Sequence, residues 1–186
     1  MAEHRVCPWW VGWLLASPLR KLAQDPSRTL EPYVRPGMTV LEPGPGMGFF
    51  TLELARLVGP EGRVVAVDVQ PKMVEGLQKR ARRAGLSDRI EARVAPAATM
   101  ALDAYDNAVD FVLAFAVVHE TPSAERFFAE AARAMKPGAS LLLAEPAGHV
   151  SEQEFENELA VARGAGLTTV GPPQVPRSQA AVLKKA

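Results

Sequence analysis

From residue 38 onward, short apolar runs alternate with longer segments in which apolar residues recur at helical spacing. This alternation is typical of repeated β–α units and of a mostly parallel sheet. It predicts an α/β fold, a Rossmann-like three-layer sandwich whose seven-stranded sheet is mostly parallel with an antiparallel last strand. The predicted strands are residues 39–42, 63–69, 90–94, 109–117, 140–145, 167–170 and 180–184.

Start and stop signals place the helices between these strands. Pro71 suits the first turn of a helix and Gly85 suits the end of one, so the pattern predicts a helix over residues 71–84. Ser123 is the expected N-cap of a helix over 123–135, which the sequence Lys-Pro-Gly at 136–138 should end. A further helix is expected over 151–163. The prolines at 172, 173 and 176 favour a stiff, extended connection, so we expect the final strand to be inserted antiparallel at the sheet edge.

The first predicted strand leads into a turn with glycine at every second position, Gly44, Gly46 and Gly48, and then into a helix. So tight a turn needs positive φ values or a close approach of the backbone to a ligand, and side chains would prevent both. The amides at the start of the following helix would meet the polar tail of that ligand. Asp68 lies 20 residues beyond Gly48, the spacing at which a carboxylate reaches ribose hydroxyls.

The glycine spacing also bears on the kind of ligand. Dinucleotide enzymes usually show G-x-G-x-x-G, whereas this turn reads G-x-G-x-G and follows an acid, Glu42. A carboxylate at Glu42 would repel a pyrophosphate but would suit an ammonium group, such as the one at the methionine end of S-adenosylmethionine. The pattern therefore favours S-adenosylmethionine over a nicotinamide cofactor.

Four segments, in this order, carry a resemblance to a known family: VLEPGPGMG, VVAVDVQ, VDFVLAFAVVHE and MKPGASLLLAEP. With these segments the chain resembles the class I S-adenosylmethionine-dependent methyltransferases, in their small-molecule branch, from about residue 38 to 147. The resemblance implies a methyltransferase that uses S-adenosylmethionine. It also implies the cofactor-binding residues Glu42, Gly44, Gly46, Gly48, Asp68, Val69, Gln70, Ala95, Ala97, Ala114 and Phe115.

Within that set, the resemblance places Glu42 and the glycines on the methionine and ribose side and Asp68 at the ribose hydroxyls. Val69 and Gln70 would flank the adenosine, and Ala114 with Phe115 would close the other side. Many family members carry an acid at the adenine contact, where this chain has Ala-Pro-Ala at 95–97. We therefore expect adenine recognition to be either weaker or mainly apolar.

His119 and Glu120 are the candidate catalytic residues, because they directly follow the strong fourth strand, at the edge where open α/β sheets bind ligands. Methyl transfer from a sulfonium requires no metal, and a general base helps only where the acceptor loses a proton as it attacks. A catalytic role for His119 and a structural one, capping the loop or bonding to the backbone, both remain open. His4 and His149 have less support.

The first 37 residues form a separate segment that holds all three tryptophans, Trp9, Trp10 and Trp13. Its apolar run is too short to span a membrane, so no stable membrane insertion is expected. The tryptophans could cover the acceptor site, pack a terminal helix onto the sheet, or attach the chain to a surface or a partner. We expect the cofactor-binding domain to comprise residues 38–186.

Amino-acid composition limits the kinds of molecule that the protein is expected to bind. The 186 residues carry 21 basic and 21 acidic side chains, so no positive excess favours nucleic acid, and a small-molecule acceptor is expected. The single cysteine, Cys7, fits a reducing, cytoplasmic location and disfavours both structural zinc and arsenic methylation. A monomer or homodimer is expected. Two alternatives remain: a nicotinamide-dependent oxidoreductase, and a non-catalytic cofactor-binding module whose turn is stiffened by Pro43 and Pro45.

Overall fold

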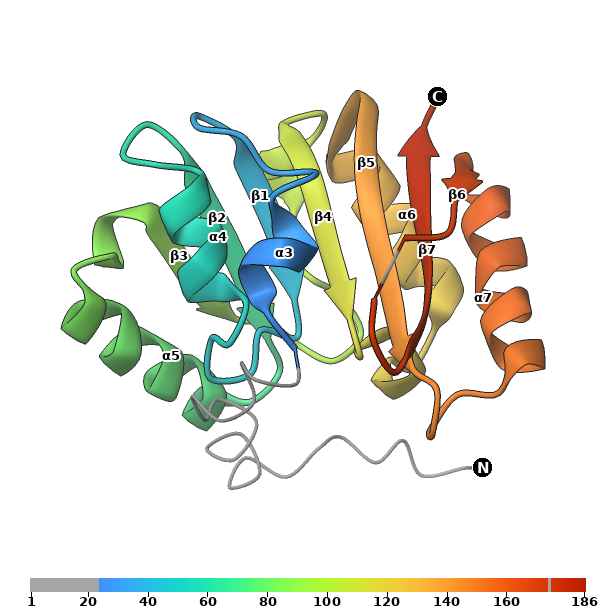
Figure 1. The fold of residues 1–186 in the computed structure, drawn as a ribbon, viewed down its shortest axis with the longest axis horizontal. Coiled ribbons are helices and arrows are strands. Elements are labelled where there is room, and N and C mark those ends of the chain that lie inside the picture. The colour runs from blue at the N-terminus through green and yellow to red at the C-terminus, as the bar shows by residue number, and fades with distance from the viewer. Residues whose placement is uncertain (1–23, 174) are drawn as a thin grey trace. The chain divides into compact units, whose positions relative to one another are not determined.

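The computed structural model describes residues 24–173 and 175–186. Of the predicted N-terminal segment, residues 1–23 with all three tryptophans lie outside the described part, and residues 24–37 lie within it. The described strands form a seven-stranded sheet of order β3-β2-β1-β4-β5-β7-β6 (Figure 1). The described chain divides into two compact units, residues 24–95 and 96–186, and each is considered by itself.

The first unit contains three parallel strands with β1 and β3 on either side of β2. Its elements are α3 (Pro26–Leu30), β1 (Thr39–Pro43), α4 (Thr51–Leu57), β2 (Arg63–Asp68), α5 (Pro71–Ala84), η1 (Ser87–Arg89) and β3 (Ile90–Val94). Strand β2 is buried from Val64 to Asp68, as a near-continuous apolar run in a parallel sheet predicts.

Helix α5 has the predicted bounds because both of its ends carry specific backbone signals. Pro71 occupies the first helical turn, and Gly85 caps the carboxyl end with a left-handed φ of 67°. Its buried face consists of Met73, Val74, Gly76, Leu77 and Ala81, at helical spacing.

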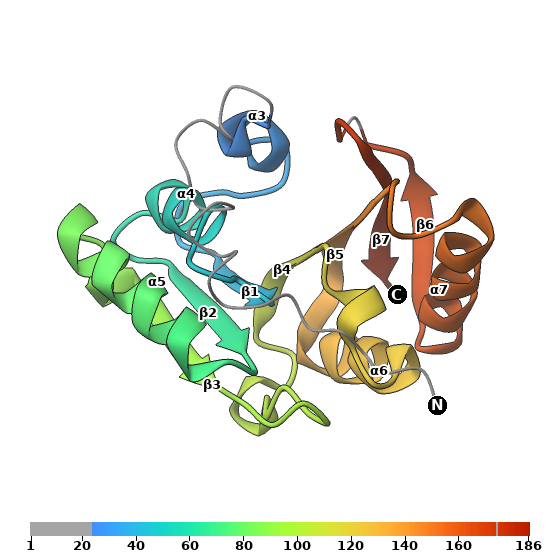
Figure 2. The same cartoon turned by 90° about the horizontal axis from the view of Figure 1, so that it is seen from below.

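The second unit contains the remaining four strands. Its elements are η2 (Asp103–Tyr105), β4 (Val109–Phe115), η3 (Val118–Glu120), α6 (Ala124–Ala134), β5 (Met135–Pro146), α7 (Glu152–Gly164), β6 (Leu167–Gly171) and β7 (Ser178–Lys185). Strands β4 and β5 are parallel, and β7 is antiparallel to both β5 and β6. Helices α6 and α7 lie side by side (Figure 2).

Both long helices of this unit begin at the serines expected from the sequence. The Ser123 side chain accepts a hydrogen bond from the Arg126 amide at 3.2 Å. Ser151 and Glu154 form a reciprocal capping box at the start of α7.

The main differences from the sequence-based expectation are the end of β4, the start of β5 and the position of β7. Strand β4 ends at Phe115 rather than 117, because Ala116 takes a left-handed φ of 53°. Strand β5 begins at Met135 rather than 140, since Met135 already pairs with Val109. The final strand β7 is antiparallel, as expected, but it is not at the edge.

Instead, β7 lies between β5 and β6, which makes β6 the edge strand. Burial explains this order: Ala181 and Leu183 of β7 are buried, whereas residues 168–170 of β6 are exposed. A short strand with exposed threonines suits an edge better than an apolar one.

The seven-stranded, mostly parallel sheet with an antiparallel last strand confirms the predicted Rossmann-like α/β fold class. Within the described residues, no helix is both long enough and apolar enough to cross a membrane.

Candidate functional site

The glycine turn between β1 and α4 requires glycine for two different reasons. Gly46 has a φ of 53°, and a Cβ there would meet no atom of the described residues within 4 Å, so among these residues its missing side chain leaves open space. Gly48 has a φ of 82°, and a Cβ there would lie 2.4 Å from Leu77 Cδ1 of α5. Gly48 therefore lets the turn approach α5, and Gly46 leaves room in front of the backbone.

Helix α5 also holds the turn in place through Met47. The Met47 side chain is buried and packs over Gly76, where a Cβ would lie 3.0 Å from Met47 Cγ. The Arg80 guanidinium donates a hydrogen bond to the Met47 carbonyl oxygen. Packing and hydrogen bonding thus fix the backbone of the turn before any ligand is considered.

Asp68, at the end of β2, lies directly against this turn. Its Oδ2 accepts a hydrogen bond from the Gly46 amide at 3.3 Å, and its Oδ1 accepts one from the Gln70 amide at 2.8 Å. Burial raises the pKa of Asp68, whereas these backbone amides lower it. Each carboxylate oxygen keeps a further lone pair for a ligand hydroxyl. The predicted role of Asp68 at a ribose fits this geometry and stays a prediction.

Glu42, on β1, is buried at 3% exposure. Its Oε2 lacks a hydrogen-bond partner among the residues described. Burial raises the pKa of Glu42 to about 8; the Thr51 hydroxyl works against this rise, and the charge of Asp68 adds to it. A buried carboxyl with an unused oxygen is suited to a cationic ligand group.

Glu42 should make the protein less stable as the pH rises. Between about pH 4.5 and pH 8 the folded protein keeps a proton on Glu42 that the unfolded chain has released. The free energy of unfolding therefore falls with pH, by up to ~1.4 kcal/mol per pH unit from this group.

Glu42→Gln removes that titration, so the variant should gain stability over the unmodified protein between pH 5 and pH 8. Denaturant unfolding at pH 4.5, 6.5 and 8 measures the gain, which should be smallest at pH 4.5. A stability difference that does not change with pH would show that Glu42 is ionised in the folded protein.

The other predicted cofactor residues fall into both units. Val69 is 39% exposed just after β2, Gln70 is the N-cap of α5, and the buried Ala95 donates its amide to the Asp68 carbonyl at 3.0 Å. These residues join the glycine-turn cluster, which we define as Glu42, Gly44, Gly46, Gly48, Asp68, Val69, Gln70 and Ala95. The exposed Ala97, the buried Ala114 and the half-buried Phe115 belong to the second unit.

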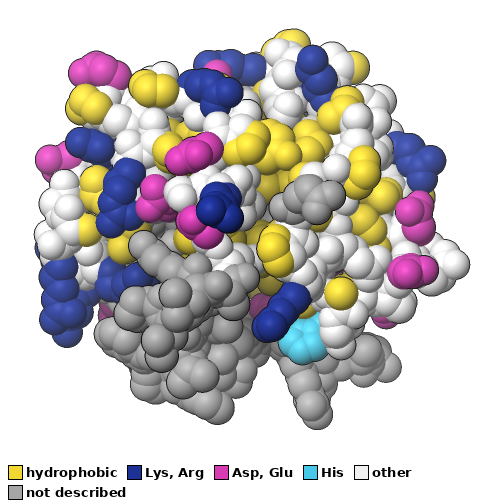
Figure 3. Space-filling view, viewed as in Figure 1, with side chains coloured by type: hydrophobic (Ala, Val, Ile, Leu, Met, Phe, Trp, Pro, Cys, Tyr) yellow, Lys and Arg dark blue, Asp and Glu magenta, His cyan; other side chains and the backbone are white. Residues whose placement is uncertain are grey.

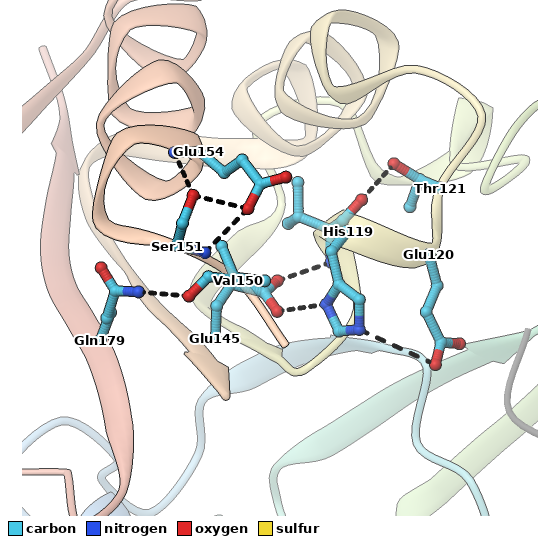
Figure 4. A network of polar contacts seen from close by, with 9 residues as sticks. His119, Glu120, Thr121, Glu145, Val150, Ser151, Glu154 and Gln179 are labelled. Atoms are coloured by element: carbon cyan, nitrogen blue, oxygen red, sulfur yellow. Dashed lines mark hydrogen bonds and ion pairs between the residues drawn. The ribbon is translucent and has the colours of Figure 1, made fainter. Parts of the chain in front are cut away.

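A second cluster lies in residues 96–186, where the parallel strands β4 and β5 end at the same edge (Figure 4). His119, in η3, contacts the Glu145 side chain at the end of β5 through its Nδ1. Glu145 is fully buried, and its Oε1 accepts a hydrogen bond from the Val118 amide at 2.8 Å. The structure thus pairs the predicted His119 with an acid that the sequence reasoning did not single out.

Further carboxyl groups surround this pair. The His119 Nε2 lies 4.0 Å from Glu120 Oε1. The hydrogen bond to Glu145 raises the pKa of His119, burial opposes the rise, and the charges of Glu145, Glu120 and Glu158 add to it. Glu158 of α7 is 9% exposed, and burial together with the Glu145 charge raises its pKa to about 8. We call His119, Glu120, Glu145 and Glu158 the His119 cluster.

Sequence reasoning missed Glu145 and Glu158. A signal for Glu145 was present, because it ends the predicted fifth strand, and the carboxyl ends of neighbouring parallel strands share an edge. Glu158 lies in a helix with many charged residues, and nothing in its spacing marks it as buried. In the described part of the chain, no group of three or more His, Cys, Asp or Glu residues is arranged to hold a metal ion.

Comparison with known proteins identifies the family. Residues 35–177 match a family described as a methyltransferase domain. The chain belongs to this methyltransferase domain family. The crystal structure of a SAM-dependent methyltransferase from Aquifex aeolicus has a TM-score of 0.84 and 26% identity to it, covering 96% of this chain and 98% of the other.

Curated relatives match the methyltransferase domain over shorter stretches. An arsenite methyltransferase from Halobacterium salinarum is 30% identical over 110 residues, 59% of this chain and 27% of the relative. A catechol O-methyltransferase from Mycobacterium tuberculosis is 50% identical over 58 residues, 31% of this chain and 26% of the relative. The aligned part of the chain thus spans about a quarter of the length of these two relatives.

Proposed function

We propose that this methyltransferase domain transfers a methyl group from S-adenosylmethionine to a small-molecule acceptor. The observation that carries the proposal is the glycine-turn cluster, in which two buried carboxyls flank a turn with open space at Gly46. The similarity to the SAM-dependent methyltransferase from Aquifex aeolicus along almost the whole of both chains supports the same cofactor.

The residues of the cluster fit this cofactor group by group. The unused oxygen of Glu42 suits the ammonium of the methionine end, and the lone pairs of Asp68 suit the ribose hydroxyls. Val69 and Ala95 offer apolar surface to the adenosine. When bound, the cofactor supplies an electrophilic methyl group on a sulfonium, so the chain itself has to bind, orient and exclude water.

A small acceptor agrees with the charge distribution on one face of the described residues. In the part of Figure 3 that is not grey, basic side chains are interspersed with acidic and hydrophobic ones. The net charge of zero likewise gives phosphate backbones no electrostatic advantage. The relatives act on catechol and arsenite by name, and a single cysteine argues against arsenite here, because that chemistry needs several thiols.

We assign cofactor binding to the glycine-turn cluster and acceptor deprotonation to the His119 cluster. His119 would take the proton of the acceptor, and the Glu120 carboxylate would stabilise the resulting imidazolium. Further parts of the proposal are taken from the sequence: binding contacts by Ala97, Ala114 and Phe115, a cytoplasmic location and a monomeric or homodimeric state.

Calorimetry with three ligands tests the function directly. The protein should bind S-adenosylmethionine and S-adenosylhomocysteine with micromolar or tighter affinity and should not bind NAD measurably. Binding of NAD alone would overturn the proposal in favour of an oxidoreductase. Binding of S-adenosylmethionine without methyl transfer to any member of a panel of phenols, alcohols and amines would favour a non-catalytic module.

A further inference from the structure

The Glu145 side chain has two fixed partners that together determine its orientation. Its Oε1 accepts the Val118 amide hydrogen at 2.8 Å, and its Oε2 contacts His119 Nδ1. A backbone amide can only donate a hydrogen bond, so the atom that faces Val118 must be an acceptor. The Val118 amide therefore requires a hydrogen-bond acceptor from any side chain at position 145, and this sets the orientation of that side chain.

The same geometry determines which nitrogen of His119 carries hydrogen in the neutral ring. A carboxylate can only accept, so Nδ1 must donate to Glu145, and Nε2 is then the nitrogen with a free lone pair. Figure 4 shows the ring between the two acids, with Nδ1 toward Glu145 and Nε2 toward Glu120. The His119 side chain is 23% exposed, whereas Glu145 is fully buried, so a ligand can reach the ring but not the acid behind it.

We infer that Glu145 is a positioning residue that keeps Nε2 of His119 as the proton-accepting nitrogen, and that the acceptor is protic, with an O–H or N–H group as the attacking atom. This inference rests on the proposed function. The acceptor proton moves to Nε2, the electron pair of the O–H or N–H bond remains on the attacking atom, and that atom forms the new bond to the methyl carbon. The sulfur keeps the electron pair of the bond that breaks.

An acceptor that attacks through a lone pair and has no proton to lose would gain nothing from this arrangement.

The charged and titratable groups around His119 come from three elements and a nearby ring: Glu120 of η3, Glu145 of β5, Glu154 and Glu158 of α7, and the His149 ring, whose centroid lies 6.3 Å away. Ionised Glu120, Glu145 and Glu154 favour the imidazolium, and Glu158 does so only above its pKa of about 8, so the ring can hold the proton once it has taken it.

Glu145→Gln should switch neutral His119 to its other tautomer. The glutamine oxygen has to face the Val118 amide, so its NH₂ group faces His119 and donates to Nδ1. The neutral ring then carries its hydrogen on Nε2, which turns the accepting nitrogen into a donor. Loss of the acceptor carboxyl should also lower the titration midpoint of His119.

Nitrogen-detected NMR of the whole chain measures both effects, and assignment is simple because the chain has three histidines. The unmodified protein should show neutral His119 with hydrogen on Nδ1, and Glu145→Gln should show it on Nε2. Glu158→Gln is the matched control. It replaces a buried glutamate of the same cluster that already carries a proton near neutral pH, so at pH 7 it should leave the His119 tautomer unchanged.

The inference is overturned if unmodified His119 carries its hydrogen on Nε2, a result that needs no variant to fold. It is also overturned if a folded Glu145→Gln protein keeps the original tautomer. These spectra require no cofactor, so their outcome does not depend on the proposed function. The proposed function is tested separately, by the calorimetric affinity of the same samples for S-adenosylhomocysteine.

Discussion

Gly46→Leu should remove most of the affinity for S-adenosylhomocysteine while leaving the protein folded. Gly46 has a left-handed backbone and open space in front of it, so a leucine side chain would fill the volume in which the ligand is expected. We expect a loss of more than about 100-fold in affinity, equivalent to ~2.8 kcal/mol. Calorimetric titration measures it, and denaturant unfolding of the same sample gives the change in stability.

Gly85→Leu is the matched control. Gly85 also has a left-handed backbone, with a φ of 67°, and open space around its Cβ position, but it lies at the far end of α5. Both leucines should lower the free energy of unfolding by roughly 1–2 kcal/mol, the cost of a side chain in this conformation. If both variants lose affinity equally, the loss comes from general destabilisation and the glycine turn is not the ligand site.

The sequence predicted those elements well whose ends depend only on residues close together along the chain. Helix α5 has the predicted bounds because Pro71 and Gly85 act on their own backbone. The glycine turn was likewise predictable, since positive φ values restrict the residue type directly.

Features that depend on tertiary pairing were not predictable in the same way. The Lys-Pro-Gly sequence at 136–138 resembles a helix terminator, yet Met135 already pairs with Val109, so β5 begins before it. The place of β7 between β5 and β6 depends on which strand has the more apolar faces, and a single sequence gives only a weak signal for this.

The same distinction applies to the two clusters. Glu42 and Asp68 could be proposed from spacing because they stand at fixed positions before and after the glycine turn. Glu145 and His119 are 26 residues apart and meet only because β4 and β5 are neighbours. Residue type and spacing therefore indicated the His119 position, and the fold was needed to find its partner.

Binding of S-adenosylhomocysteine should release about one proton from the protein at pH 7. Glu42 is buried, and its raised pKa of about 8 means that the free protein holds a proton there. An ammonium group against its unused oxygen would favour the carboxylate, so the proton leaves as the ligand binds. The affinity should consequently rise with pH up to about pH 8, by at most roughly tenfold per pH unit.

Titration calorimetry at pH 7 in two buffers of different ionisation enthalpy counts the released protons. Glu42→Gln should bind more weakly and release none, because its amide has no proton to lose and no charge to offer the ammonium. Glu158→Gln changes the other buried glutamate with a pKa of about 8 and should release the same number of protons as the unmodified protein. Binding without proton release in the unmodified protein would mean that Glu42 does not meet the ammonium, and the carboxyl would then be a buried acid that no ligand neutralises.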